Sequence, residues 1–276
     1  MKERLALDMV VSLLTEPLRK EEILVSATGP PEQVTWLPST LRLTAFPSPS
    51  PQTGQREWWQ DLVGDVPATR TVQPRMGITQ EEGVVEGKTL AIIVASTRID
   101  LIATATNDPE SSEAGFPTMG SLTQNLEWFI SLARRWLALT TRPPLQRLAF
   151  GAVLEHPVGN RPEGYRYLSR VLPAVTLDPD GSSDFLYQIN RPRNVTVPGL
   201  EIGVNRLSKW LVAVLRIAII SPRLERLGPE FFAARLELDV NTEQDFAGEF
   251  SETQVVAVFD ELIRLGVEIS NHGDIP

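Results

Sequence analysis

Apolar and polar residues alternate strictly between positions 232 and 241, and this stretch constrains the fold more than any other. The apolar members are Phe232, Ala234, Leu236, Leu238 and Val240, and the intervening ones are Ala233, Arg235, Glu237, Asp239 and Asn241. Successive side chains of a β-strand point to opposite faces of its sheet, so the alternation predicts a strand with one core face and one polar face. The other segments can be placed around the sheet that contains this strand.

Two preceding segments complete a predicted meander of three long strands. Residues 184–191 also alternate, and residues 204–219 are rich in β-branched and aliphatic side chains. The segment 192–199 between them contains two prolines and a glycine, which are typical turn residues. We therefore expect residues 192–199 to form a loop between the first two strands.

A serine followed three residues later by a glutamine marks the start of two predicted helices. The pairs are Ser121 with Gln124, before a helix over residues 122–139, and Ser251 with Gln254, before a helix over residues 252–265. In this capping box each of the two side chains bonds the backbone N–H of the other residue. Gly266 stands where a glycine of positive φ commonly ends a helix, so the second helix is predicted to end there.

The predicted elements follow the same order twice. Strand, helix, three strands and helix occupy residues 41–46, 56–63, 72–106 and 122–139, and then residues 145–154, 162–172, 184–241 and 252–265. Runs of strands mixed with helices predict an α+β fold of antiparallel sheets with packed helices. The repeated βαβββα order predicts a tandem duplication, with coincidence as the alternative. The predicted division is an N-terminal helix and strand extension (1–40), a first half (41–142) and a second half (143–276).

The composition excludes several classes of function. The chain contains no cysteine, which excludes disulfides, thiolate nucleophiles and cysteine-based metal sites. Its 26 Lys and Arg against 35 Asp and Glu give a net charge of -9, which opposes non-specific attraction to nucleic acids and anionic membranes. The longest apolar run, residues 210–219, contains Arg216 and is shorter than the ~20 residues of a membrane helix. These features favour a cytoplasmic protein without membrane contact.

The sequence contains none of the common catalytic or cofactor motifs. No Gly-x-Ser-x-Gly elbow accompanies His156 or His272, and phosphate-loop, dinucleotide and His-Glu-x-x-His patterns are absent. Acidic turns lack the glycine and glutamate positions of an EF-hand loop. We therefore predict no cofactor, no metal site and no catalytic residue. Glu237 and Asp239, two apart on one strand face, leave a carboxylate-based hydrolase as an alternative.

Polar and basic side chains of the meander form the main predicted binding surface. They are Gln188, Asn190, Arg191, Arg193, Asn205, Arg206, Lys209 and Arg235. In an antiparallel meander such residues can converge on one surface, where guanidinium and amide groups suit a carboxylate, a phosphate or a peptide backbone. The alternative is a solvated face of ion pairs with Glu201, Glu237 and Asp239.

The adjacent tryptophans Trp58 and Trp59 form a second predicted binding feature. Neighbouring side chains differ in direction by ~100° on a helix, so one buried face does not easily hide both rings. Because tryptophan is enriched at binding hot spots, one ring is predicted at an edge, an intramolecular contact or a partner surface. Core packing on two sides is the alternative.

The chain has few groups that could act in catalysis, and its meander carries many polar and basic side chains on one face. Together these features predict a non-catalytic binding or scaffold protein that contacts a protein partner or its own copy. An RNA-associated accessory protein that uses the arginine-bearing sheet surface is the second prediction. A carboxylate-based hydrolase is the third.

Overall fold

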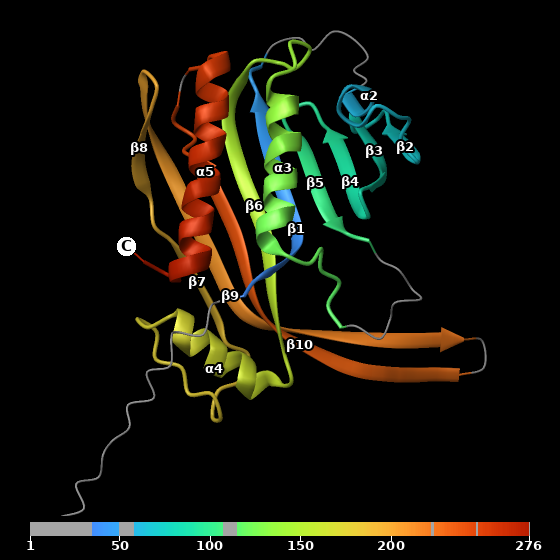
Figure 1. Cartoon of the computed structure of the whole chain (residues 1–276), viewed down its shortest axis with the longest axis vertical. Coiled ribbons are helices and arrows are strands. Elements are labelled where there is room, and N and C mark those ends of the chain that lie inside the picture. The colour runs from blue at the N-terminus through green and yellow to red at the C-terminus, as the bar shows by residue number, and fades with distance from the viewer. Residues whose placement is uncertain (1–34, 50–57, 107–114, 222–223, 247, 276) are drawn as a thin grey trace, which may run out of the picture. The chain divides into compact units, whose positions relative to one another are not determined.

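A ten-stranded antiparallel sheet organises the residues that the computed structural model describes, which are 35–49, 58–106, 115–221, 224–246 and 248–275 (Figure 1). The elements in chain order are β1 (Leu37–Pro47), α2 (Trp58–Val63), β2 (Thr69–Gln73), β3 (Ile78–Val85), β4 (Lys88–Val94), β5 (Ile99–Ala105), α3 (Leu122–Leu137), β6 (Leu145–Val158), α4 (Arg161–Val171), β7 (Leu186–Asn190), β8 (Arg193–Val197), β9 (Leu200–Ser221), β10 (Leu224–Thr242) and α5 (Glu252–His272). Only the backbone is described at 217–221 and 224–228. The helix and strand predicted for the N-terminal extension fall within residues 1–34, outside the described residues. The α+β prediction is confirmed.

The strands follow the order β2-β3-β4-β5-β1-β6-β10-β9-β7, and β8 also pairs with β9. The first strands of the two predicted halves, β1 and β6, are therefore neighbours at the centre of the sheet. Within the described elements, each half runs strand, helix, four strands, helix, which is one strand more than the sequence predicted. An origin of this repeated order by tandem duplication stays a prediction.

The extra strand of the second half, β8, lies in the segment that was predicted as a loop. It pairs with the start of β9 through a turn at Pro198 and Gly199, where the glycine has a φ of 69°. Val195 and Val197 of β8 are buried. The loop prediction is wrong because the two prolines flank the strand, where they remove no hydrogen bond from its ladder.

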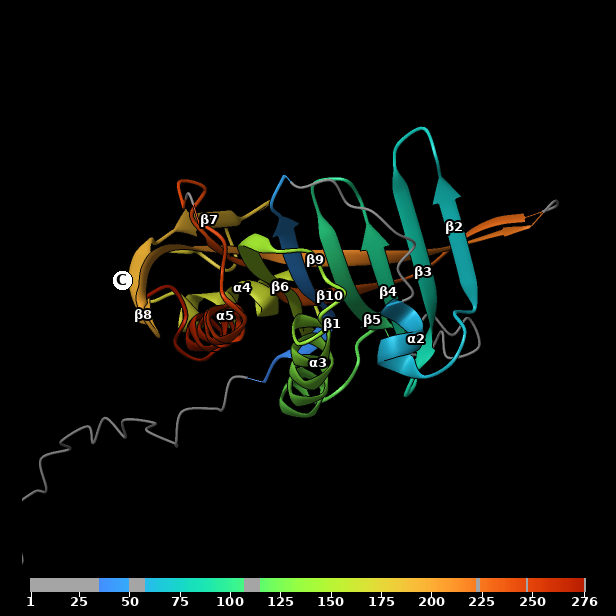
Figure 2. The same cartoon turned by 90° about the horizontal axis from the view of Figure 1, so that it is seen from above.

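The described helices all cover the same face of the sheet. Figures 1 and 2 show α3 over β1 and β5, and α5 over β6 and β10, with α2 and α4 beside them. Leu41 and Leu43 of β1 and Phe150 and Leu154 of β6 point to this face and are buried. Alternate residues point to the opposite face, over which no helix of the described residues lies. We call this second face the open face.

α5 begins as the sequence predicted but ends later. The Ser251 side chain accepts a hydrogen bond from the Gln254 backbone and the Gln254 side chain accepts one from the Ser251 backbone, which confirms the capping box. The predicted end at Gly266 is wrong, because the helix continues to a cap at Gly273, whose φ is 73°. A Cβ at position 266 would lie 2.9 Å from the Phe150 ring, so this glycine lets α5 approach the sheet closely.

α3 also starts at its predicted position, but without a capping box. Ser121 is the N-cap residue and its side chain makes no capping hydrogen bond. The Asn125 side chain instead donates to the carbonyl oxygens of Ser121 at 2.7 Å and Met119 at 2.9 Å. This amide ties the first turn of α3 to the segment before it, which takes over the role predicted for Gln124.

β9 and β10 continue past the end of β6. β10 pairs with β6 only between Phe232 and Asn241, whereas residues 224–231 pair with β9 alone. The two strands therefore project from the sheet as a two-stranded arm (Figure 1). At its root, Gly115 packs against the Phe231 ring and the Phe116 ring lies over the guanidinium of Arg235.

Candidate functional site

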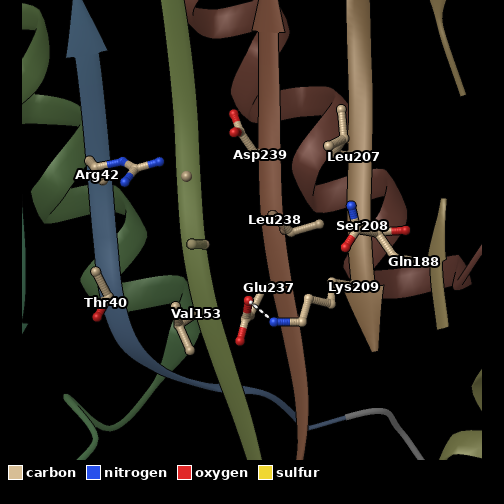
Figure 3. Close-up of a pocket in the computed structure, with 12 residues that line it drawn as sticks. Thr40, Arg42, Val153, Gln188, Leu207, Ser208, Lys209, Glu237, Leu238 and Asp239 are labelled. Carbon is tan, nitrogen blue, oxygen red and sulfur yellow. Dashed lines mark hydrogen bonds and ion pairs between the residues drawn. The ribbon is translucent and has the colours of Figure 1, made fainter. Parts of the chain in front are cut away.

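A groove of about 410 Å³ crosses the central strands on the open face (Figure 3). Its lining residues are Thr40, Arg42, Gly151, Ala152, Val153, Gln188, Leu207, Ser208, Lys209, Glu237, Leu238 and Asp239. Strand register orders the side chains in rows: Arg42, Gly151 and Asp239 lie side by side in one row. The groove is therefore lined by five strands, and its polar side chains come from β1, β7, β9 and β10.

Gly151 of β6 forms the floor of this groove. A Cβ at this position would lie 3.2 Å from Nε and from Nη2 of Arg42, so the guanidinium lies over the glycine. The Nε atom of Arg42 is buried without a hydrogen-bond partner, and no described carboxylate forms an ion pair with this side chain. A buried unpaired donor is unfavourable, and the described residues leave this one unsatisfied.

The two carboxylates of the groove differ in their partners. Glu237 forms an ion pair with Lys209 at 3.0 Å. Asp239 accepts a hydrogen bond from the Asn241 side chain at 3.1 Å and has no basic partner among the described residues. Asn205 donates to Asn241 at 3.2 Å, which fixes the orientation of the amide beside Asp239. The groove thus carries one satisfied ion pair and two unpaired charges of opposite sign.

A buried ion pair marks one end of the open face. Glu155 of β6 is fully buried, and Arg235 of β10 donates to one of its oxygens from Nε at 2.8 Å and from Nη2 at 2.6 Å. The other carboxylate oxygen has no partner among the described residues. Burial raises the pKa of Glu155, although the hydrogen bond and charge of Arg235 act in the opposite direction. Glu155 is thus withdrawn from solvent, while Arg235 stays partly exposed beside the Phe116 ring.

The structure divides the predicted binding set between the two faces. Gln188, Asn190, Asn205, Lys209 and Arg235 lie on the open face, and the Asn190 side chain donates to Asn205 at 2.8 Å. Arg191, Arg193 and Arg206 lie on the side of α5 instead. Residues next to each other on a strand point in opposite directions, so Asn205 and Arg206 cannot share one face.

Arg206 is buried beneath α5. Its Nη2 atom donates to Glu268 at 3.3 Å, while Nε and Nη1 have no partner among the residues described. Desolvation lowers the pKa of Arg206, and the charge of Arg193 adds to this effect while Glu268 opposes it. Arg193 also donates to Glu268, at 3.0 Å. Both arginines therefore fasten α5 to β8 and β9, and Arg206 presents no charge to the solvent.

Arg191 fastens the end of α5 in a similar way. Its Nε and Nη2 atoms donate to the Asp274 carboxylate at 2.5 and 2.9 Å, and the Tyr187 hydroxyl donates to the same group at 2.6 Å. The hydrogen bond from Arg191 lowers the pKa of Asp274, with a further contribution from Tyr187, although burial opposes the shift. Asp274 in turn raises the pKa of Tyr187.

Trp58 and Trp59 are both buried, with 1% and 2% of their surfaces exposed. The Trp58 ring makes an edge-to-face contact with Trp136 of α3 at a centroid distance of 5.4 Å. The Trp59 ring lies against Gly83 of β3, where a Cβ would come within 2.8 Å. Because α2 is enclosed on two sides, each ring packs against a different neighbour. This arrangement is the predicted alternative of core packing on two sides. Neither ring is available to a partner protein.

Sequence patterns alone did not select Arg42 or Gly151. An isolated glycine inside a strand marks a close approach by another group, and Gly151 lies inside a strand that was predicted at residues 145–154. That signal could have drawn attention to this position. Nothing in the sequence, however, identifies Arg42 as the group that lies over it, because β1 and β6 are far apart in the chain.

Comparisons with known proteins find no match to this chain among protein-family models, curated proteins or solved structures. No helix in the described part of the chain is long and apolar enough to cross a membrane. The described residues also contain no group of three or more His, Asp or Glu side chains placed to hold a metal ion. The open face is therefore interpreted from its own geometry.

Proposed function

We propose that this protein is a non-catalytic binding protein and that the open face of its sheet is the surface that contacts another protein molecule. The observation that carries the proposal is the groove over Gly151, in which Arg42 and Asp239 have unpaired charges of opposite sign among the described residues. Protein interfaces combine such complementary charges with apolar contacts, which provide specificity and orientation. The proposal keeps the cytoplasmic location that the composition predicts.

The charge of the groove favours a protein over RNA as the partner. Arg42 and Lys209 are balanced there by Glu237 and Asp239. A phosphate backbone carries one sign of charge and is bound by surfaces with an excess of Lys and Arg. The arginines Arg191, Arg193 and Arg206, on which the RNA prediction depended, are engaged beside α5.

The same geometry gives little support to a carboxylate-based hydrolase. Such an enzyme needs two carboxyl groups that can act as acid and as base or nucleophile. Glu237 is held by Lys209 at 3.0 Å and Asp239 is hydrogen-bonded to Asn241. A pair of binding groups fits this arrangement better than a pair of catalytic groups.

Site-specific photo-crosslinking tests the proposal. A photoreactive residue replaces Gln188, which is exposed on the open face, and in a matched variant it replaces Arg135, which is exposed on α3. We expect a discrete crosslinked protein species from position 188 and none from position 135. Equal crosslinking from both positions, or crosslinks to nucleic acid alone, would contradict the proposal. A crosslinked species that persists when Asp239 is replaced by lysine would also count against it.

A further inference from the structure

Two charged side chains of the groove lack an oppositely charged partner among the described residues, and they flank the same glycine. Arg42 of β1 and Asp239 of β10 both lie in register with Gly151 of the strand between them. Figure 3 shows the guanidinium pointing across β6 from one side and the carboxylate turned toward β6 from the other. The groove therefore has a basic wall and an acidic wall around a central glycine.

The row continues on each side of these residues with an apolar residue. Ile102 of β5 is in register with Arg42, and Leu207 of β9 is in register with Asp239. Both apolar side chains are partly exposed. Read from β5 to β9, the row is apolar, basic, glycine, acidic and apolar. The two charges of this five-residue part are opposite in sign, and beyond it the row continues to Ala91 of β4 and Asn190 of β7.

We propose that the open face binds the open face of a second copy of this chain, so that Arg42 of each copy pairs with Asp239 of the other copy. The inference rests on the proposed function, because it names the partner of the same surface. A two-fold axis parallel to β6 above Gly151 places each side of the row opposite the other side. Arg42 then faces Asp239 and Ile102 faces Leu207, while Gly151 faces Gly151 of the second copy.

The dimensions of the side chains agree with this pairing. Two packed sheets lie about 10 Å apart, a distance that an arginine and an aspartate can bridge together when they point toward each other. Glycine at the axis leaves room for the guanidinium groups, which in the single chain lie over it. The pairing also supplies acceptors to a guanidinium whose Nε has none in the described residues of one chain.

A second copy explains more of the row than another occupant does. A nucleic acid would satisfy Arg42 but would be repelled by Asp239 and Glu237. An unrelated protein could satisfy one charge with any residue. A two-fold related copy satisfies both charges and places Ile102 against Leu207 with the same residues, as a self-complementary interface requires.

Charge exchange combined with sedimentation velocity over a range of concentrations tests the proposal. For the wild-type chain we expect a dimer that dissociates on dilution. Arg42→Glu alone and Asp239→Lys alone should each weaken the dimer by about tenfold or more, since each places like charges opposite one another twice. An equimolar mixture of the two variants should recover a dimer that contains one copy of each. At one contact the two introduced charges are opposite in sign and face each other. At the other contact the native Arg42 and Asp239 face each other. Arg135→Glu, on α3, is the control with the same change of charge and should dimerise like the wild type.

The outcomes separate this inference from the proposed function. A wild-type chain that remains monomeric, variants that dimerise normally, or a mixture that does not recover the dimer would each overturn the pairing. If the chain is monomeric and position 188 still crosslinks to a different protein, the open face remains a binding surface and only the second copy is excluded. Binding of a single-stranded RNA that is lost in Arg42→Glu would overturn both proposals. Circular dichroism and thermal unfolding confirm that each variant is folded.

Discussion

The covered face and the open face of the sheet each contain a glycine that makes room for a large side chain, but the side chain differs. On the covered face, Gly266 lets α5 approach the sheet, and the space beside it is filled by the Phe150 ring. On the open face, Gly151 also leaves space, and it is filled by the guanidinium of Arg42. An aromatic ring in the core excludes water, whereas a guanidinium brings a charge and hydrogen-bond donors to the groove. The glycine of the covered face thus makes room for close packing, and the glycine of the open face makes room for a charged side chain.

The two faces also differ in the surroundings of an arginine, Arg206 on the covered face and Arg42 on the open face. Arg206 lies under α5 with Glu268 as its partner, and its charge contributes to holding a helix in place. Arg42 lies in a groove without a carboxylate partner among the described residues. Both have an Nε without a partner in the described part of the chain, but only Arg42 lines the groove of the open face. The surroundings, and not the residue type, decide whether a charge stabilises the fold or is available for binding.

The largest expected effect is on the covered face. Gly266→Val places a Cβ within 2.9 Å of the buried Phe150 ring and adds two methyl groups, so α5 must move away from the sheet. We expect a loss of about 2 kcal/mol or more in the free energy of unfolding, measured by urea denaturation. Asn271→Val, at an exposed position of α5, is the control and should change stability by less than about 0.5 kcal/mol. Equal effects of the two changes would show that α5 is not closely packed at this glycine.

A smaller effect is expected where the end of α5 is fastened. Asp274→Asn removes the charge that Arg191 and Tyr187 bind, and we expect a loss of about 1 kcal/mol at neutral pH, because solvent screens part of the interaction. A carboxyl whose pKa is lowered by folding stabilises the native state fully above its ordinary pKa and loses this effect as the pH falls through the folded pKa. The difference from wild type should therefore shrink as the pH is lowered. Unfolding measured from neutral to acidic pH checks this sign, and Asp61→Asn, exposed on α2, is the control.

Glu155, the buried carboxylate of the open face, should make the stability depend on pH in the opposite direction to Asp274. Burial raises the pKa of Glu155, so the native state holds its proton more tightly than the unfolded state does. Wild-type stability should therefore fall as the pH rises from the ordinary glutamate pKa toward the raised value. Glu155→Gln keeps an acceptor for Arg235, so we expect a change of less than about 1 kcal/mol and the loss of this slope. The exposed Glu201→Gln is the control. If the slope of stability against pH is unchanged in Glu155→Gln, the slope belongs to another group.

The smallest effect on stability is expected at the floor of the groove. In Gly151→Ala the new Cβ meets the flexible end of Arg42 at 3.2 Å, and this end can move into the groove. Because alanine also restricts the unfolded chain, we expect a net change within about 1 kcal/mol. The same variant should weaken self-association in sedimentation velocity, since the guanidinium is displaced. A large loss of stability would mean that Gly151 serves the core and not the groove.

Local sequence patterns predicted much of the architecture and little of the site. The period of two at residues 232–241 and the capping box before α5 depend on neighbours within a few positions, and both predictions are confirmed. β8 was missed because prolines at its ends resemble the signature of a loop. The helix was predicted to end at Gly266 because the sequence does not distinguish a glycine that allows close packing from a glycine that ends a helix.

The sequence by itself determined the strands and helices, the polar character of one sheet face and the absence of cysteine chemistry, because these follow from composition and from short-range periodicity. Only the tertiary structure decided which polar residues meet. Arg42, Gly151 and Asp239 come from strands separated by long stretches of chain, and the hydrogen-bond register between those strands places them in one row. Register is a property of pairs of distant segments, so no pattern within one segment contains it.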